Sequence, residues 1–85
     1  MSDNAAIAET VRAMCLERLG VDDLKDDEEF FDRGANSLTV VELQIQLEKK
    51  LELKVPTSTL MASPSIEGWI GVYSQAAEQA KTAAE

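Results

Sequence analysis

The most strongly patterned stretch of the chain is SLTVVELQIQLEKKLEL, residues 37–53. Its apolar residues recur every three or four positions, which is the period of one face of an α-helix: Val40, Leu43, Leu47 and Leu51. Asn36 or Ser37 can cap the start of this helix. Basic residues gather near its end, where they complement the helix dipole: Lys49, Lys50 and Lys54. The stretch therefore predicts a helix with one buried face.

The same helix carries a second apolar row, formed by Leu38, Val41 and Ile45 at helical spacing. This row is rotated around the helix from the first, and a single buried stripe does not require it. The residues alone leave two interpretations equally open: the row is part of the core, or it is an exposed docking surface.

Upstream, a helix is predicted over about residues 4–19, with an inward stripe of Ile7, Val11, Cys15 and Leu19. Asp3 or Asn4 can cap it, and Gly20 ends it. Residues 21–36 contain seven acidic and two basic side chains and keep no helical period. We expect a long loop there, with Leu24, Phe30 and Phe31 held in the core and Gly34 in a turn.

Downstream, Pro56 ends the central helix, because the residue before a proline avoids the α-helical region. TSTLM, residues 57–61, is long enough for one short helix with Thr57 as its cap. A last helix starts near Ser65 and directs Ile66, Trp69 or Ile70, and Tyr73 inward. The chain is thus predicted to be all-α, with four helices in a single domain over residues 1–85. Its ordered core spans about 4–77, and residues 78–85 form a frayed tail with little to bury.

Composition excludes several classes of protein. The 85 residues include 16 acidic and 8 basic side chains, for a net charge of −8, which argues against nucleic acid or an anionic membrane surface as partner. No apolar run approaches the roughly 18 residues of a membrane-spanning helix, and no secretory leader pattern follows Met1. The single cysteine cannot form an internal disulfide, so we expect a cytoplasmic monomer.

An enzyme is not expected. The chain has no histidine, the usual base for serine and cysteine nucleophiles and a usual zinc ligand. Cys15 fits a small core residue. The acidic cluster does not match the EF-hand calcium pattern, so it is predicted to be a solvated loop with no metal: Asp22, Asp23, Asp26, Asp27, Glu28 and Glu29.

Ser37 is the main candidate for chemistry, because its hydroxyl lies at the start of the best helix, after a Gly-Ala-Asn turn. From position alone, an ordinary N-cap is the commoner role of such a serine. If Asn36 caps instead, Ser37 is free for covalent modification, and a phosphodiester there is favoured by the positive end of the helix dipole.

The segment FFDRGANSLTVVELQIQLEKKLELKVP, residues 30–56, resembles the phosphopantetheine-attachment region of acyl and peptidyl carrier proteins. That region has a Phe, a short turn, Gly-x-Asp-Ser-Leu, and then a helix containing Glu-Leu. The resemblance implies a four-helix bundle of the acyl-carrier type, with a long first loop and a short third helix. It also implies that Ser37 carries the 4′-phosphopantetheine arm. Asn36 replaces the usual aspartate, which removes one charge beside the attachment point.

The resemblance further implies the cofactor and the partners. A phosphopantetheinyl transferase would attach the arm, taken from coenzyme A, and acyl- or amino-acid-loading enzymes and synthase or condensing enzymes would follow. Five residues are expected to contact these partners: Asn36, Leu38, Val41, Glu42 and Ile45. Thr39, Lys49 and Lys50 leave few acids on this helix, which favours polyketide or non-ribosomal peptide biosynthesis over fatty-acid synthesis. The alternative is a non-covalent helical adaptor that binds a partner through the Leu38–Val41–Ile45 row.

Overall fold

The computed structural model describes the backbone of residues 3–83 and the side chains of residues 5–80. Within this range every element of regular secondary structure is a helix: α1 (Asp3–Leu19), the 3-10 helix η1 (Phe30–Arg33), α2 (Ser37–Leu51), α3 (Thr57–Ala62) and α4 (Ile66–Ala83). No described helix is long and apolar enough to cross a membrane. The all-α prediction with four α-helices, the third of them short, is confirmed.

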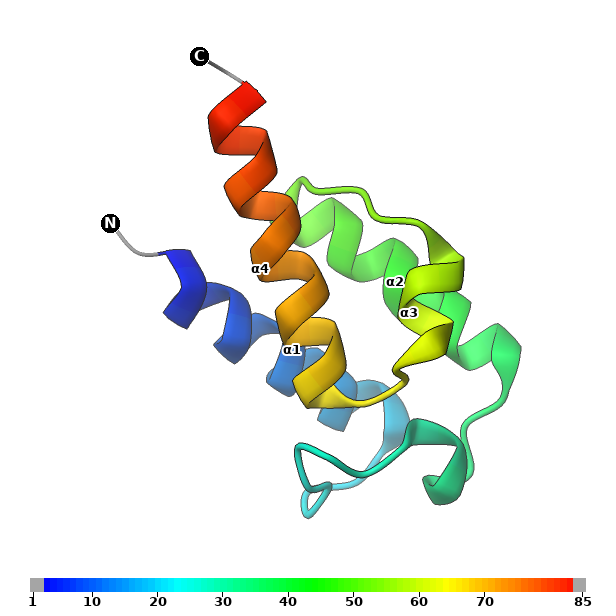
Figure 1. Ribbon diagram of the computed structural model, residues 1–85. Coiled ribbons are helices and arrows are strands. Elements are labelled where there is room, and N and C mark those ends of the chain that lie inside the picture. Colours follow the sequence, from blue (N-terminus) through cyan, green and yellow to red (C-terminus); the bar gives the residue numbers. More distant parts are fainter. Residues whose placement is uncertain (1–2, 84–85) are drawn as a thin grey trace.

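Helix α1 contacts both α2 and α4, and the short α3 contacts α4. Figure 1 shows that the start of α1 and the end of α4 lie on one side of the molecule. The start of α2 lies on the other side, next to η1 and the long first loop.

The core is built from the predicted stripes. Helix α1 buries Ile7, Val11 and Cys15, α2 buries Val40, Leu43 and Leu47, and α4 buries Ile66, Trp69 and Tyr73. Leu19 and Leu51, the last members of their stripes, are partly buried against this core. The sequence predicts that either Trp69 or Ile70 points into the core. The structure shows that it is Trp69, which is fully buried, whereas Ile70 is only partly buried.

Trp69 joins three elements in this core. Its ring meets the Phe30 ring of η1 edge-on at a centroid distance of 5.2 Å, and the Tyr73 ring at 6.3 Å. Its indole Nε1 donates a hydrogen bond of 3.1 Å to the Leu60 carbonyl oxygen of α3. Because a buried indole N–H needs an acceptor, this bond fixes α3 against α4.

The first loop follows the prediction in part. Leu24 and Phe30 are buried as expected, but Phe31 is 39% exposed, so its assignment to the core is wrong. The reason is that residues 30–33 form η1, in which neighbouring side chains point in different directions and only Phe30 reaches Trp69. Two backbone hydrogen bonds tie this region to the start of α4: Phe30 N donates to Pro64 O, and Glu67 N donates to Asp26 O, both at 2.8 Å.

The helix ends agree with the sequence prediction at Gly20 and differ from it at the end of α2. Gly20 ends α1 as predicted, with a positive φ of 72° and its N–H bonded to the Leu16 carbonyl. Helix α2 ends at Leu51 rather than at residue 53, because Glu52 adopts a left-handed conformation with φ 58°. Asp3 and Asn4, the proposed caps of α1, lie within that helix, and their side chains are outside the described ones.

Thr57 is not the cap of α3, as the sequence had suggested. Pro56 holds the cap position and Thr57 is the first helical residue. The Thr57 hydroxyl instead donates to Gln44 Oε1 of α2, at 2.9 Å. Gln44 Nε2 in turn donates to the Val55 carbonyl, so this buried amide connects α2 to the segment before α3. Helix α4 continues to Ala83, and fraying of residues 78–85 stays a prediction that in part concerns residues outside the described range.

Candidate functional site

The structure assigns the α2 cap to Asn36. Asn36 has an extended backbone, with φ −117° and ψ 177°, and its side-chain oxygen accepts hydrogen bonds from Thr39 N at 2.9 Å and from Thr39 Oγ1 at 3.1 Å. Because Asn36 caps the helix, the Ser37 hydroxyl is not needed as a cap and is free for covalent modification.

Ser37 is exposed and is the first residue of α2. Within the described part of the chain, its hydroxyl makes no hydrogen bond, and the backbone N–H groups of Ser37 and Leu38 also lack an acceptor. Unpaired N–H groups at a helix start carry partial positive charge and favour an anionic group nearby. The position therefore fits a phosphodiester on the Ser37 oxygen, exposed at the surface and next to two donors.

The backbone before Ser37 is held by a buried residue. Phe30 lies in the core, and its carbonyl oxygen accepts the N–H groups of Gly34 and Ala35. Gly34 makes the turn with φ 95°, in the left-handed region that glycine enters without strain. After the site, Val40 N donates to Asn36 O at 3.1 Å, and Val40 is buried. Ser37 thus lies between two segments that the core fixes in place.

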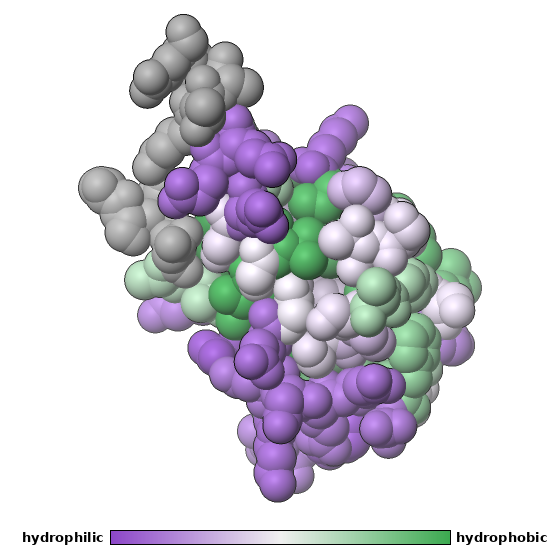
Figure 2. Space-filling view, in the orientation of Figure 1, coloured by the Kyte–Doolittle hydropathy of each residue, from purple (hydrophilic) through white to green (hydrophobic). Residues whose placement is uncertain are grey.

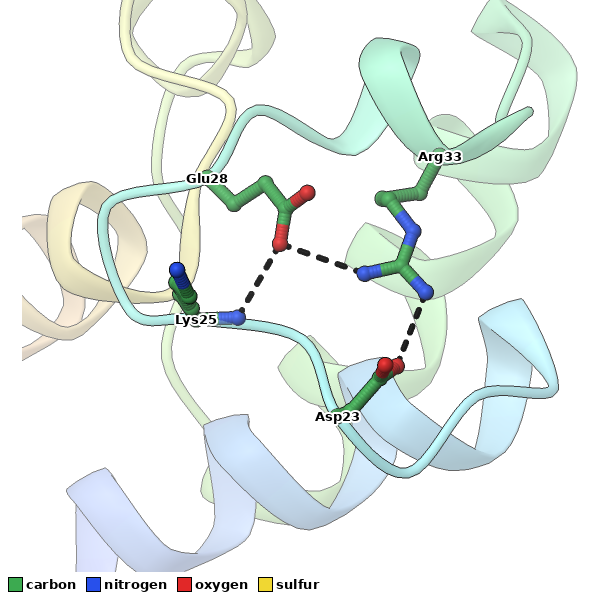
Figure 3. Close-up of polar contacts among 4 residues, drawn as sticks. All are labelled: Asp23, Lys25, Glu28 and Arg33. Carbon is green, nitrogen blue, oxygen red and sulfur yellow. Dashed lines mark hydrogen bonds and ion pairs between the residues drawn. The ribbon is translucent and has the colours of Figure 1, made fainter.

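Sequence reasoning missed the ion pairs that Arg33 makes beside this turn. Figure 3 shows the Arg33 guanidinium between the carboxylates of Asp23 and Glu28, with N–O distances of 2.8 and 3.2 Å. Hydrogen bonding to Arg33 lowers the pKa of Asp23 below its usual value. We call these three residues the Arg33 bridge. No periodic pattern marks it, because its members are five and ten residues apart in an irregular segment.

The second apolar row of α2 lies mainly at the surface. Leu38 is 66% exposed and Ile45 50% exposed, whereas Val41 between them is partly buried. Figure 2 shows hydrophobic surface on the side where Figure 1 draws α2 and α3, and hydrophilic surface around the first loop. The open question from the sequence is thus answered for Leu38 and Ile45, which are not core residues.

Glu42 lies beside this row and is already paired. Its carboxylate accepts a hydrogen bond from the Arg18 guanidinium of α1, and both side chains are partly exposed. Glu42 is the one acidic residue that the sequence offers between Ser37 and Gln46. The exposed N-terminal half of α2 therefore presents apolar surface with little net charge.

Cys15, the only cysteine of the chain, is a core residue. It is fully buried in the core. Burial raises the pKa of the Cys15 thiol to about 12, which keeps it protonated and inert at neutral pH. The thiol of this chain therefore offers no reactive group at the surface.

Comparison with known proteins agrees with this geometry. Residues 9–72 match the family model described as the phosphopantetheine attachment site. An acyl carrier protein from Sulfurovum sp. (strain NBC37-1) is 41% identical over 54 residues, which cover 60% of this chain and 72% of that protein. The chain belongs to the phosphopantetheine-attachment family of carrier proteins.

A solved structure shows the same fold. The solution structure of PCP, a prototype for the peptidyl carrier domains of modular peptide synthetases, superposes with a TM-score of 0.69. The match covers 79% of this chain and 88% of that one, at 22% sequence identity. The predicted bundle of the acyl-carrier type is confirmed. As a member of this family, the protein is a carrier rather than a catalyst, and it bears covalently bound 4′-phosphopantetheine.

Proposed function

We propose that Ser37 is the residue that carries 4′-phosphopantetheine, and that the protein holds thioester-linked intermediates of polyketide or non-ribosomal peptide biosynthesis. The observation that carries the proposal is the exposed Ser37 hydroxyl at the start of α2, left without a hydrogen bond because Asn36 provides the cap. Ser37 also lies within residues 9–72, which match the model of the phosphopantetheine attachment site.

The attachment reaction would be catalysed by a separate transferase. The Ser37 oxygen forms a bond to the β-phosphorus of coenzyme A, the bond to the bridging anhydride oxygen breaks, and adenosine 3′,5′-bisphosphate leaves. The serine proton passes to a base of the transferase, because this chain has no histidine and shows no base beside the hydroxyl within the described residues. A magnesium ion bound by the transferase would neutralise the pyrophosphate.

Two features of α2 support polyketide or non-ribosomal peptide synthesis over fatty-acid synthesis. The helix has Thr39, Lys49 and Lys50 at exposed or partly exposed positions, and its acid nearest the site, Glu42, is paired with Arg18. The relative and the solved structure are named for acyl and peptidyl carriers respectively, which supports both forms of cargo. The donor coenzyme A and the reduced cysteine fit a cytoplasmic protein.

Intact-mass measurement tests the attachment. After incubation with coenzyme A, magnesium and a broad-specificity phosphopantetheinyl transferase, we expect one added phosphopantetheine group per chain. An unchanged mass, with a known carrier domain loaded in the same tube, would favour the alternative of a non-covalent adaptor. The cargo itself can be read from the mass of the thioester on protein purified rapidly from its own cells, as an aminoacyl group or an acyl chain.

Val41→Asp separates partner contact from folding. Val41 is partly buried but is not among the apolar residues that pack on the core cluster. We expect this variant to slow transferase loading strongly while the free energy of unfolding falls by only about 0.5 kcal/mol, as for a substitution at the surface. If Val41 belonged to the core, burial of an unpaired carboxylate at this position would cost several kcal/mol. Gln46→Asp, at an exposed position of the same helix, is the matched control. Unfolding of the Val41 variant would assign the residue to the core, and normal loading would remove it from the partner surface.

Glu42→Lys is expected to slow association with the transferase at low salt and less at high salt, because charges at the rim of an interface act mainly on the association rate. The change also breaks the pair with Arg18, which can lower stability by up to about 1 kcal/mol. Arg18→Gln breaks the same pair and leaves Glu42 in place. The association rates of both variants are to be measured across a salt series. If the two variants show the same rates and the same salt dependence, Glu42 contributes to association only through its pair with Arg18.

A further inference from the structure

The Arg33 bridge joins two parts of the irregular segment before α2. Arg33 is the last residue of η1, whereas Asp23 and Glu28 belong to the first loop. Arg33 Nη2 lies 2.8 Å from Asp23 Oδ1, and Nη1 lies 3.2 Å from Glu28 Oε1. The Arg33 and Glu28 side chains are 25% and 29% exposed, whereas the Asp23 side chain is 74% exposed, so the pair with Glu28 is partly shielded and the pair with Asp23 lies at the surface. The guanidinium fork suits this role, because its donors can meet two carboxylates at once.

Glu28 also closes the loop on itself. The carboxylate oxygen that faces Arg33 accepts a second hydrogen bond from Lys25 N at 3.2 Å, and Glu28 N donates to Lys25 O at 3.1 Å. Figure 3 shows the Glu28 carboxylate between the Lys25 amide and the Arg33 guanidinium. The bridge therefore connects a closed turn of the loop to η1.

Other contacts hold this part of the loop to α1 and α4 rather than to η1, among them the hydrogen bond from Glu67 N to Asp26 O at 2.8 Å. Leu24 is buried, and the Asp26 carboxylate pairs with Arg12 of α1 at 2.7 Å. The side chains of Asp22, Lys25 and Asp27 are exposed, as is that of Glu29. On its other side η1 is fixed by buried Phe30, and only the Gly34 turn, Ala35 and Asn36 separate Arg33 from Ser37. Among the described side chains, the bridge thus provides the ion pairs that connect the loop to η1, the segment that leads to the serine.

We propose that Arg33 is a positioning residue for loading: through Asp23 and Glu28 it holds the first loop against η1, so that the surface beside Ser37 is already formed when the transferase binds. The proposal rests on Ser37 as the attachment residue. A surface that is ordered before binding loses less conformational entropy in the complex, and this lowers the concentration of carrier that the transferase needs. Arg33 contributes no atom to the reaction.

Four variants test this proposal in transferase assays at saturating coenzyme A, with the carrier concentration varied. Arg33→Gln and Asp23→Asn break the same ion pair but shift the net charge in opposite directions. Glu28→Gln breaks the second pair. We expect all three to raise KM for the carrier by about threefold to tenfold, with kcat nearly unchanged. Arg12→Gln is the matched control, because it removes the same charge as Arg33→Gln and breaks another ion pair of the loop, the one to Asp26.

Hydrogen exchange provides the structural readout. Amides of residues 23–35 are expected to exchange faster in the three bridge variants, whereas helices α1 and α4 keep wild-type protection. Melting temperatures should change little, because partly exposed ion pairs contribute little to global stability.

Opposite KM changes in Arg33→Gln and Asp23→Asn would assign the effect to charge and overturn the proposal. An equal KM increase in Arg12→Gln, or faster exchange without a change in KM, would overturn it as well. These outcomes are distinct from failure of the attachment site, in which the wild-type protein itself gains no phosphopantetheine.

Discussion

Ser37→Ala is expected to abolish attachment of phosphopantetheine and to leave the fold intact. The variant lacks the Ser37 hydroxyl, to which we assign the phosphoester bond; the other hydroxyl in the first turn of α2, that of Thr39, is engaged with the Asn36 side chain. Helix α2 keeps its cap, because the Asn36 side chain rather than the Ser37 hydroxyl accepts the Thr39 N–H. The far-UV circular dichroism spectrum and the melting temperature should therefore stay close to those of the wild type, while intact mass shows no gain.

The matched control for this prediction is Ser58→Ala. Ser58 is also exposed and also lies in the first turn of a helix, α3. The control should gain one phosphopantetheine group at the wild-type rate. If Ser37→Ala still gained the mass, the arm would be attached elsewhere, and peptide mapping of the loaded variant would locate it.

Leu47→Ala is expected to destabilise the protein by roughly 2–5 kcal/mol. Leu47 is fully buried on the inner face of α2, so truncation removes apolar contacts and leaves a cavity. Small domains have a total stability of about 5–15 kcal/mol, and a large part of it would be lost. Urea denaturation followed by circular dichroism measures the difference.

Ile45→Ala is the control on the same helix, since it truncates a branched aliphatic side chain that is 50% exposed. Its free energy of unfolding should stay within about 0.5 kcal/mol of the wild-type value. A loss below about 1 kcal/mol for Leu47→Ala, or equal losses for both variants, would mean that α2 buries a different face.

The sequence predicts the helices well because burial of a helix face leaves a period in the chain. Ile7, Val11 and Cys15 repeat every four residues and are all buried, and the same rule finds Leu43 and Leu47. The rule depends only on local geometry, so it needs no knowledge of which helices pack together. It also separates the second row of α2 from the first, although only the structure shows that Leu38 and Ile45 lie at the surface.

Contacts between distant polar side chains leave no such period. Arg33 and Asp23 are ten residues apart in an irregular segment, and Gln44 reaches Thr57 across the turn after α2. The sequence shows that these residues are polar but not which partner each one finds. The caps are ambiguous for a similar reason, since Asn36 and Ser37 have side chains of equal capping ability and only the backbone geometry decides between them. The burial predicted for Phe31 is wrong because a 3-10 helix of four residues is too short to leave a recognisable pattern of apolar residues in the sequence.

The position of Trp69 makes its intrinsic fluorescence a probe of how the helices pack. It is the only tryptophan of the chain, and it touches Phe30 of η1, Tyr73 of α4 and the Leu60 carbonyl of α3. Its fluorescence emission therefore reports on whether η1 and α3 stay packed on α4, without any dye or label. An enzyme that moves either segment on binding the carrier would change the wavelength or the intensity of this one signal. Docking and release could then be followed in real time in a stopped-flow instrument, provided that the partner's own tryptophans are replaced or subtracted.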